Sequence, residues 1–261
     1  MIRFLEKNDK DAVISLWQEA FGDKSEEISV FLDFFNENLL VFEEDGQIVS
    51  MLTLIKTEID GKKGRYIYAV ATDKRFRGMG YASRLIEFAK QFISENDEKF
   101  LVLVPRNKPL FDFYKRQGFC ELSCAETIKK KISFKENTDL KTEIIDAKEY
   151  FYLRNAYFSG EKYAVWDINM LEFIKNAYKG DFFALKKNHI LCGTGFCYKQ
   201  GDLLVISELL EKEKSDEIID TMGTFFGVKE VFCIKAQKYG ERFAMIYPKE
   251  FCDAYFGLAM K

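Results

Sequence analysis

The residues with the clearest chemical potential lie between Val70 and Ser83, where a strand pattern, a basic loop with two glycines and a helix pattern follow one another. Gly78 and Gly80 have no side chain, so the backbone can turn tightly there and approach a ligand closely. The helix that follows presents unpaired N–H groups and a partial positive charge at its first turn. Arg75 and Arg77 add full positive charge. This combination predicts a binding site for a pyrophosphate group.

Two common nucleotide-binding loops do not fit these residues. A dinucleotide-binding turn has GxGxxG directly after the strand, whereas here Gly78 lies six residues after Thr72 and Ser83 stands at the third glycine position. A Walker loop contains Gly-Lys-Ser/Thr, which this segment lacks. A basic surface turn before a helix is the alternative that spacing alone leaves open.

A second group of residues follows on a short predicted helix that begins near Asn107 and ends before Gly118. Tyr114 lies on this helix. Because Phe111 and Phe113 precede it closely, spacing alone favours an aromatic core residue.

The elements that must position these residues follow from hydrophobic periodicity. Residues 81–94 form an amphipathic helix, because their apolar side chains share one stripe. Residues 100–104 are uniformly apolar and predict a buried strand. The same reasoning places the remaining strands at 2–5, 39–42, 48–59 and 65–72, and two helices at 10–21 and from 25 to 35.

Together these features resemble the GCN5-related N-acetyltransferase (GNAT) family. Residues 75–82, Arg-Phe-Arg-Gly-Met-Gly-Tyr-Ala, fit its signature Q/R-x-x-G-x-G/A, and Asn107, Tyr114 and Phe119 fall in its second signature, N…FY…GF. The resemblance covers residues 1–134 in the family's order, β-α-α-β-β-β-α-β-α-β. The proline often found near Asp73 is missing.

The second half of the chain repeats the first at an offset of about 142 residues, after a polar linker at 135–142. Its loop position, 208–215, contains no glycine, so we expect no acetyl-CoA there. The whole resembles the tandem acetyltransferases typified by the enhanced-intracellular-survival proteins, and it ends where those carry a third, sterol-carrier-like domain. We therefore predict an α/β (α+β) fold of two tandem GNAT-like domains, each a mixed, mostly antiparallel sheet flanked by helices. These are a catalytic domain at 1–134 and a degenerate one at 140–261, which closes one wall of the acceptor cleft or mediates self-association.

The resemblance implies acetyl transfer from acetyl-CoA to a primary amine, with no metal. It implies that the backbone of Val70, Ala71 and Thr72 pairs with the pantetheine arm. Asn107 would contact the pantetheine side, and Tyr114 would donate a proton to the departing thiolate. The residues implied to cradle the pyrophosphate are Arg75, Phe76, Arg77, Gly78, Met79, Gly80, Tyr81, Ala82 and Ser83.

The amine must also lose a proton. An alkylamine with a pKa of about 10.4 is neutral roughly once in 2,500 molecules at pH 7, which costs about 4.6 kcal/mol. Some relatives use a glutamate on the strand before the loop, where this chain has Tyr66 and Tyr68. The terminal carboxylate of Lys261, a water relay or another group could serve as the base, and a frayed terminus is the alternative reading of Lys261.

Charge predicts the kind of acceptor. Residues 19–45 hold nine acids against one base, Lys24, and this favours a cationic acceptor such as a polyamine, an aminoglycoside or a lysine-bearing molecule. A solvated helix face is the competing interpretation. The nine acids are Glu19, Asp23, Glu26, Glu27, Asp33, Glu37, Glu43, Glu44 and Asp45.

Composition excludes several other classes. The net charge of −3 gives no general attraction to nucleic acid, and no apolar run reaches the length of a membrane span. The six cysteines form no CxxC pair, and the single histidine, His189, falls in a predicted surface turn. We expect reduced, buried cysteines in a cytoplasmic protein. A sensor that binds acyl-CoA without turnover, and a structural partner of another protein, are the alternative functions.

Overall fold

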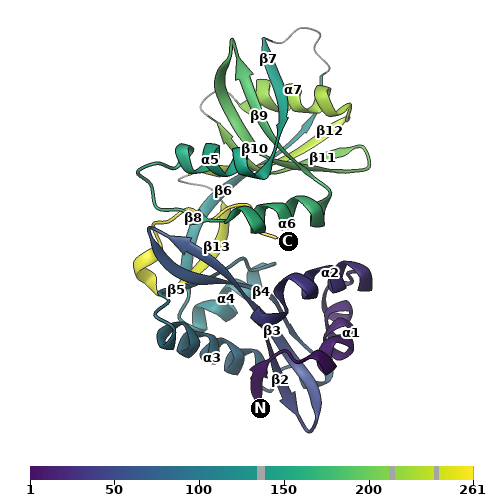
Figure 1. Cartoon of the computed structure of the whole chain (residues 1–261), viewed down its shortest axis with the longest axis vertical. Helices are drawn as coiled ribbons and strands as arrows, with labels where there is room; N and C mark the ends of the chain where they lie inside the picture. The colour runs from purple at the N-terminus through teal and green to yellow at the C-terminus, as the bar shows by residue number, and fades with distance from the viewer. Residues whose placement is uncertain (134–138, 212–214, 238–240, 261) are drawn as a thin grey trace. The chain divides into compact units, whose positions relative to one another are not determined.

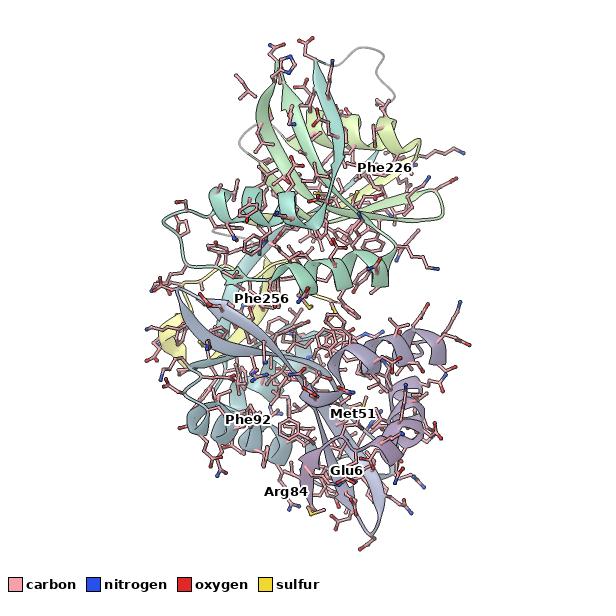
Figure 2. All side chains as sticks on the ribbon, in the orientation of Figure 1. Glu6, Met51, Arg84, Phe92, Phe226 and Phe256 are labelled. Carbon is pink, nitrogen blue, oxygen red and sulfur yellow. The ribbon has the colours of Figure 1, made fainter. Side chains whose placement is uncertain are left out.

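The computed structural model describes residues 1–133, 139–211, 215–237 and 241–260. Contacts divide the chain into two compact units. Unit 1 comprises Met1–Glu121 and Ala244–Cys252, and unit 2 comprises Leu122–Phe243 and Asp253–Lys261. Figure 1 shows the ribbon and Figure 2 the side chains that fill each unit. Both units combine a mixed sheet with flanking helices, as the sequence predicts.

Unit 1 has the predicted order of elements. The strands of its sheet lie in the order β1-β2-β3-β4-β5-β13, and only β4 and β5 run parallel. Helices α1 and α2 lie on one face of this sheet and α3 and α4 on the other (Figure 1). The elements are β1 (Ile2–Phe4), α1 (Lys10–Phe21), α2 (Ser25–Phe35), β2 (Leu39–Glu44), β3 (Gln47–Ile59), β4 (Lys62–Thr72), α3 (Tyr81–Glu95), β5 (Phe100–Leu103) and α4 (Lys108–Arg116).

Helix α3 covers the centre of the unit 1 sheet. Its predicted apolar stripe is buried, with Leu85, Ile86 and Ala89 fully covered and Ile93 nearly so. These side chains pack in one core cluster with apolar residues of β2, β3, β4 and β5. At about 25 cal/mol per Å² of apolar surface, this burial is the main force that fixes the helix and its N-terminus to the sheet.

Unit 2 repeats the strand and helix pattern with fewer helices. Its strands lie in the order β6-β12-β11-β10-β9-β7, and only β11 and β12 run parallel. Its elements are β6 (Cys120–Lys131), β7 (Leu140–Ile145), α5 (Ala147–Tyr157), β8 (Ala164–Val165), α6 (Ile168–Tyr178), β9 (Asp181–Lys187), β10 (Ile190–Gln200), β11 (Leu203–Glu211), α7 (Ser215–Phe226) and β12 (Glu230–Gln237).

Two predictions for the second half of the chain can be compared with the structure. His189 lies exposed in the turn between β9 and β10, as expected. Of the predicted linker at 135–142, residues 135–138 fall outside the described residues, while Leu140 already begins β7. The first strand of the repeat therefore begins at Leu140, before the end of the predicted linker.

The two units are not consecutive stretches of the chain. Strand β13 (Glu241–Tyr247) joins the sheet of unit 1, where Met245 pairs with Leu103 and Tyr247 with Leu101. Strand β6 follows α4 of unit 1, and from Leu122 onward it belongs to unit 2, where it pairs with β12. This division differs from the boundaries of 1–134 and 140–261 expected from sequence, because periodicity identifies a strand without identifying its partner.

Two further features bear on function. In the ranges that the structure describes, no helix is both long and apolar enough to cross a lipid bilayer. Cys192, Cys197 and Cys233 are buried as expected, whereas Cys120 is partly exposed and Cys252 is exposed. The expectation of buried cysteines is therefore wrong for Cys252, which ends a short 3-10 helix at the surface.

The strand exchange predicts that residues 1–134 do not form a stable unit by themselves. Without β13, the paired edge of β5 and the buried positions of Ala244, Met245 and Ile246 are lost. Burying a methionine or isoleucine side chain contributes about 1.5–3 kcal/mol, so Met245 and Ile246 account for much of the stability of a small domain. Thermal unfolding followed by circular dichroism should show no cooperative transition for the 1–134 fragment. A cooperative transition at the midpoint of the full chain would contradict this.

Candidate active site

The parallel strands β4 and β5 separate halfway along β4. They pair only at three positions, Gly64 with Phe100, Arg65 with Leu101 and Tyr66 with Val102. Among the described residues, no strand pairs with Ile67–Thr72 along the edge that faces β5. Val70, Ala71 and Thr72, the predicted partners of an extended ligand, lie on this open edge. A strand edge with unpaired N–H and C=O groups can bind an extended molecule as a further strand would.

A bulge in β4 accompanies the separation. The register between β3 and β4 shifts between Met51 and Thr53, and Ala69 opposite has a φ of +52°. A bulge bends its strand and increases the local twist. The bend lies at the point where β4 leaves β5, and it redirects residues 70–72.

The paired end of the two strands is fixed by a buried ion pair. Both Arg65 and Glu98 have side chains that are 9% exposed, and the guanidinium binds the carboxylate at 2.6 and 2.7 Å. Gly64 contributes by its lack of a side chain, because a Cβ there would lie 2.6 Å from the ring of Phe100. The paired ends of β4 and β5 are therefore held rigidly, and the two strands separate beyond them.

Polar contacts also fix the far end of β4. The hydroxyl of Ser50 donates to the carbonyl of Ala71 at 2.7 Å, and Nε of Arg77 donates to the carbonyl of Thr72 at 3.1 Å. These two carbonyls already have a protein donor, so the predicted ligand contacts fall mainly on the remaining backbone groups of residues 70–72. Ser50 could not be identified from sequence, because a serine inside a strand carries no distinctive signal.

The loop between β4 and α3 has the conformation that its glycines allow. Gly78 and Gly80 have φ values of +81° and +83°, and Gly80 is the N-cap of α3. A Cβ at either position would meet no atom within 4 Å, so the backbone conformation, rather than space, requires glycine. In the part of the chain that is described, no protein group accepts a hydrogen bond from the backbone N–H groups of residues 78–82. These amides and the helix N-terminus are free to receive an anion at the place where the sequence predicts a pyrophosphate site.

The two predicted loop arginines differ in their partners. Arg75 binds Asp73 at 2.7 Å, and its backbone N–H also donates to that carboxylate at 2.8 Å. The side-chain and backbone hydrogen bonds from Arg75 lower the pKa of Asp73. Arg77 has no carboxylate partner among the described residues, so it contributes uncompensated positive charge to the loop.

Other predicted loop residues hold the loop in place or face solvent. The ring of Phe76 contacts that of Tyr81, and Tyr81 contacts Phe42 in the core. Met79 is 60% exposed, and the hydroxyl of Ser83 accepts a hydrogen bond from the side chain of Gln117 at 3.0 Å. The last contact joins the first turn of α3 to the end of α4.

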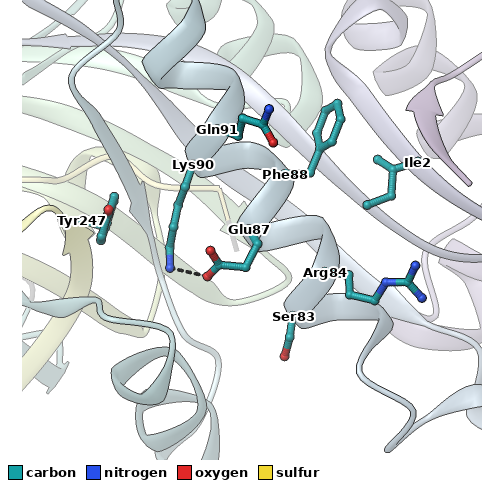
Figure 3. A pocket seen from close by; sticks show the side chains of 8 residues that line it. All are labelled: Ile2, Ser83, Arg84, Glu87, Phe88, Lys90, Gln91 and Tyr247. Carbon is teal, nitrogen blue, oxygen red and sulfur yellow. Dashed lines mark hydrogen bonds and ion pairs between the residues drawn. The ribbon is translucent and has the colours of Figure 1, made fainter.

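A recess of about 640 Å³ lies along the outer side of α3, next to this loop (Figure 3). Arg84 lies at its edge, with its guanidinium 4.5 Å from the centre of the Phe42 ring. Lys90 binds Glu87, three residues earlier on α3, at 2.6 Å, as the dashed line marks. The recess is lined by Ile2, Ser83, Arg84, Glu87, Phe88, Lys90, Gln91 and Tyr247.

Helix α4 carries the two residues of the second predicted motif. Asn107 is its N-cap, and its side-chain oxygen accepts a hydrogen bond from the N–H of Leu110 at 3.2 Å. This role satisfies a helix-end donor and explains an asparagine there without a ligand. The ring of Tyr114 packs against Phe113 and Phe119. Its hydroxyl makes no hydrogen bond to a described residue, and burial raises its pKa.

Unit 2 lacks the strand separation at the corresponding place. Its parallel pair β11–β12 continues through Ile206 with Cys233 to Leu209 with Lys235, past a bulge. Lys235 also binds Glu211 at 2.5 Å, and the Glu211 side chain is 2% exposed. Only residues 238–240 separate β12 from β13, which is too short for a counterpart of α4. Of the predicted loop at 208–215, residues 208–211 still belong to β11, and 212–214 lie outside the described residues.

A buried carboxylate on β11 is fully engaged. Glu208 accepts hydrogen bonds from Arg154 at 2.8 Å, from Tyr255 at 3.0 Å and from Tyr150. Burial, followed by the charge of Glu208, raises the pKa of Tyr150 and of Tyr255. Since three donors fix this carboxylate, it holds the segment around Tyr255 onto unit 2 and is not available as a base.

The predicted acceptor side of unit 1 carries its acids on α1, α2 and the β2–β3 turn. Several are already paired, as Asp33 is with Lys10 at 2.7 Å and Glu43 with Arg3 at 2.9 Å. Lys261 lies outside the described residues. In the described part of the chain, no group of three or more histidine, cysteine or acidic side chains could hold a metal ion.

Comparison with known proteins agrees with this geometry. Residues 10–119 match the model of the acetyltransferase (GNAT) family. The fold is similar to a GCN5-related N-acetyltransferase from Kribbella flavida, with a TM-score of 0.70 and 13% identity over 94% of this chain and 70% of that one. It is also similar to Eis1 from Mycobacterium abscessus, with a TM-score of 0.59 and 8% identity over 94% and 73% of the two chains. A tandem GNAT protein from the clavulanic acid biosynthesis pathway gives a TM-score of 0.60 and 9% identity over 94% and 98%. A search of curated proteins found no match.

The Asp73–Arg75 contact predicts an acid-dependent contribution to stability. Because the folded-state pKa of Asp73 is lowered, the contribution is fully present above the ordinary carboxyl pKa of about 3.9 and is lost as pH falls through the lower folded value. In urea unfolding, the stability difference between the parent and Asp73→Asn should be constant above about pH 5 and shrink below about pH 4. A difference that does not change with pH would contradict this assignment.

Proposed function

Residues 10–119 belong to the acetyltransferase (GNAT) family, and from this premise we propose that the chain is an acetyl-CoA-dependent N-acetyltransferase acting on a primary amine. The observation that carries the proposal is the separation of β4 from β5 directly before a loop whose amides have no protein acceptor. An open strand edge suits the amide-containing pantetheine arm, and the loop suits the pyrophosphate that follows it. Unit 1 contains the open strand edge followed directly by the loop, whereas unit 2 lacks the open strand edge.

In this proposal the backbone of residues 70–72 binds the pantetheine arm, and the N–H groups of residues 78–82 bind the pyrophosphate. Arg77 supplies the charge attraction, while Arg75 and Asp73 hold the loop in shape. Arg84, beside the recess along α3, is a further cation within reach of the phosphorylated end of the coenzyme.

Tyr114 acts on the departing sulfur by hydrogen bonding. As the amine nitrogen bonds to the acetyl carbon, the carbon–sulfur bond breaks and negative charge develops on sulfur. A free thiol has a pKa of about 8.5, well below that of a tyrosine whose pKa burial raises above about 10. Complete proton transfer from Tyr114 to the thiolate is therefore unfavourable, whereas donation of a hydrogen bond stabilises the developing charge.

Two features guide the choice of acceptor and base. Strand β4 holds Tyr66 and Tyr68 where some relatives have a glutamate, so we assign removal of the amine proton to water. The unpaired acids of α2 and of the 3-10 turn that follows it, such as Glu26 and Glu37, lower the energy of a cation and favour a positively charged amine. We place this acetyltransferase in the cytoplasm.

The absence of a carboxylate on β4 also favours a second candidate, a protein that binds acyl-CoA as a sensor without turnover. The two candidates share the binding site and differ in whether an amine releases the coenzyme thiol. Tyr114 distinguishes them, because a sensor has no use for a donor at the sulfur.

Replacement of Tyr114 by phenylalanine should lower kcat for thiol release roughly 10²-fold and leave the affinity for acetyl-CoA nearly unchanged. The assay follows free thiol with a panel of cationic, neutral and anionic amines. Tyr198→Phe is the control, since that tyrosine lies on β10 of unit 2, outside the proposed coenzyme site. We expect the highest activity with cationic amines.

Acetyl-CoA binding without thiol release from any amine, together with an unaffected Tyr114→Phe variant, would replace the enzyme by the sensor. A preference for anionic or neutral amines would remove the cationic acceptor and leave the reaction standing.

Arg77→Gln should weaken CoA binding about tenfold, equivalent to about 1.4 kcal/mol, because it removes the uncompensated charge of the loop. Arg75→Gln, whose parent side chain is committed to Asp73, should have a smaller effect. Calorimetry should also give one CoA per chain. Equal losses in the two variants, or two sites per chain, would contradict the assignment.

A further inference from the structure

Helix α4 is held in unit 1 by little apolar burial of its own. It has nine residues, and Tyr114 is the one that is buried. Leu110, Phe111 and Phe113 are only partly covered. A helix of this length is not stable in isolation, so contacts with neighbouring elements determine where it lies. Because the hydroxyl of Tyr114 has no hydrogen-bond partner among the described residues, its position follows from that of the helix.

The end of α4 is fixed by a cation, the ammonium group of Lys90 on α3. Its Nζ donates to the carbonyl of Gln117, the C-cap of α4, at 2.6 Å. The last carbonyls of a helix have no partner within the helix and carry partial negative charge, so a cation stabilises this end. The Lys90 side chain is 14% exposed, and solvent therefore screens this contact less than it screens a surface pair.

The same ammonium group also contacts β13. It lies 4.8 Å from the centre of the Tyr247 ring, a distance at which a cation is attracted to an aromatic face. Figure 3 shows Lys90 between Tyr247 and Glu87. The Glu87 carboxylate binds Lys90 at 2.6 Å, but this side chain is 63% exposed and lies on α3 itself. Lys90 therefore joins three elements of unit 1, and Glu87 adds no link to another element.

Two series of contacts lead from Lys90 to Tyr114. Along the backbone, the N–H groups of Gln117 and Phe119 both donate to the carbonyl of Tyr114 at 3.0 Å. Through the rings, Phe119 lies between Tyr247 and Tyr114, with ring centres 5.9 and 5.8 Å apart. Lys90 contacts the first member of each series, Gln117 and Tyr247. Removing its ammonium group therefore loosens both.

The end of α4 is also linked to the start of α3. The side chain of Gln117 donates to the hydroxyl of Ser83 at 3.0 Å, in the first turn of α3. The N–H groups of residues 78–82, directly before Ser83, are the proposed site of the coenzyme pyrophosphate. Lys90 thus fixes α4 at the point where this helix meets the coenzyme loop.

We propose that Lys90 is a positioning residue for acetyl transfer, which fixes the hydroxyl of Tyr114 beside the sulfur by holding the end of α4. The proposal rests on the proposed function, in which Tyr114 donates a hydrogen bond to the departing sulfur. A hydrogen bond weakens steeply as its distance and angle change, so a small displacement of Tyr114 reduces the stabilisation of the developing charge. Lys90 touches neither the coenzyme sulfur nor the amine, and its effect passes through Tyr114.

The first test measures kcat for thiol release and the affinity for acetyl-CoA in variants of the full chain. Lys90→Met keeps an apolar stem and removes the ammonium group, and we expect kcat to fall roughly tenfold with the affinity nearly unchanged. Lys90→Arg keeps the charge and the donors, so it should recover most of the lost kcat. Glu87→Gln is the matched control, because it removes the exposed partner of the same ammonium group, and it should leave kcat unchanged.

Two further measurements show whether Lys90 acts through Tyr114. In the Tyr114→Phe background, Lys90→Met should have no further effect on kcat, because the hydroxyl that it positions is already absent. With 3-fluorotyrosine in place of Tyr114, the fluorine resonance should shift or broaden in Lys90→Met and stay unchanged in Glu87→Gln. This second measurement needs no activity.

An equal loss of kcat from Lys90→Met with and without the Tyr114 hydroxyl would overturn the proposal. So would an equal loss in Glu87→Gln, or no recovery in Lys90→Arg. If no amine releases thiol from the parent protein, the proposed function fails, and the fluorine resonance then decides alone. A resonance unchanged by Lys90→Met would overturn the positioning of Tyr114, and a changed one would support it.

Discussion

The separation of β4 from β5 is the constraint on which the rest of unit 1 depends. Hydrogen bonds between parallel strands are satisfied as far as Tyr66, and beyond it the edge of β4 is left without a strand partner. A buried polar edge of this kind is costly unless water or a ligand satisfies it. The structure sustains it by fixing the paired end rigidly, through Arg65 and Glu98, and by bending β4 at Ala69. The loop and the N-terminus of α3 then follow at the position where the open edge ends.

In unit 2, a small difference in strand pairing removes the open strand edge. It keeps the strand order, the parallel pair and a bulge in the first strand of that pair. Its pair nevertheless stays joined to Leu209, and Glu211 and Lys235 add an ion pair beyond that point. Closing the ladder satisfies the backbone within the protein itself, so unit 2 gains an internally complete sheet and has no edge to offer at this place. The same fold thus leaves an open strand edge in one unit and a closed ladder in the other.

Much of unit 1 could be predicted from sequence because its signals are local. The glycines of the loop, the apolar stripe of α3 and the short helix with Tyr114 each depend on residues a few positions apart. The roles of individual side chains were harder to predict. Asn107 caps a helix and Arg75 binds its neighbour Asp73, and both contacts follow from local geometry that a family signature does not encode. The exchange of β6 and β13 depends on which strand edges meet in space, and a hydrophobic pattern contains no such information.

The exchange of strands also has a consequence for how the protein is made. During synthesis the N-terminal segment leaves the ribosome first, but β5 can pair with β13 only when residues 245–247 have been added. Until then the first unit has an unpaired strand edge and an unfilled core position at Met245, while most of the second unit is already complete. Both units therefore stay incomplete until the C-terminal residues are made, because unit 1 needs residues 244–252 and unit 2 needs residues 253–261. The edge of β5 stays without its β13 partner from the synthesis of β5 until residues 245–247 are added.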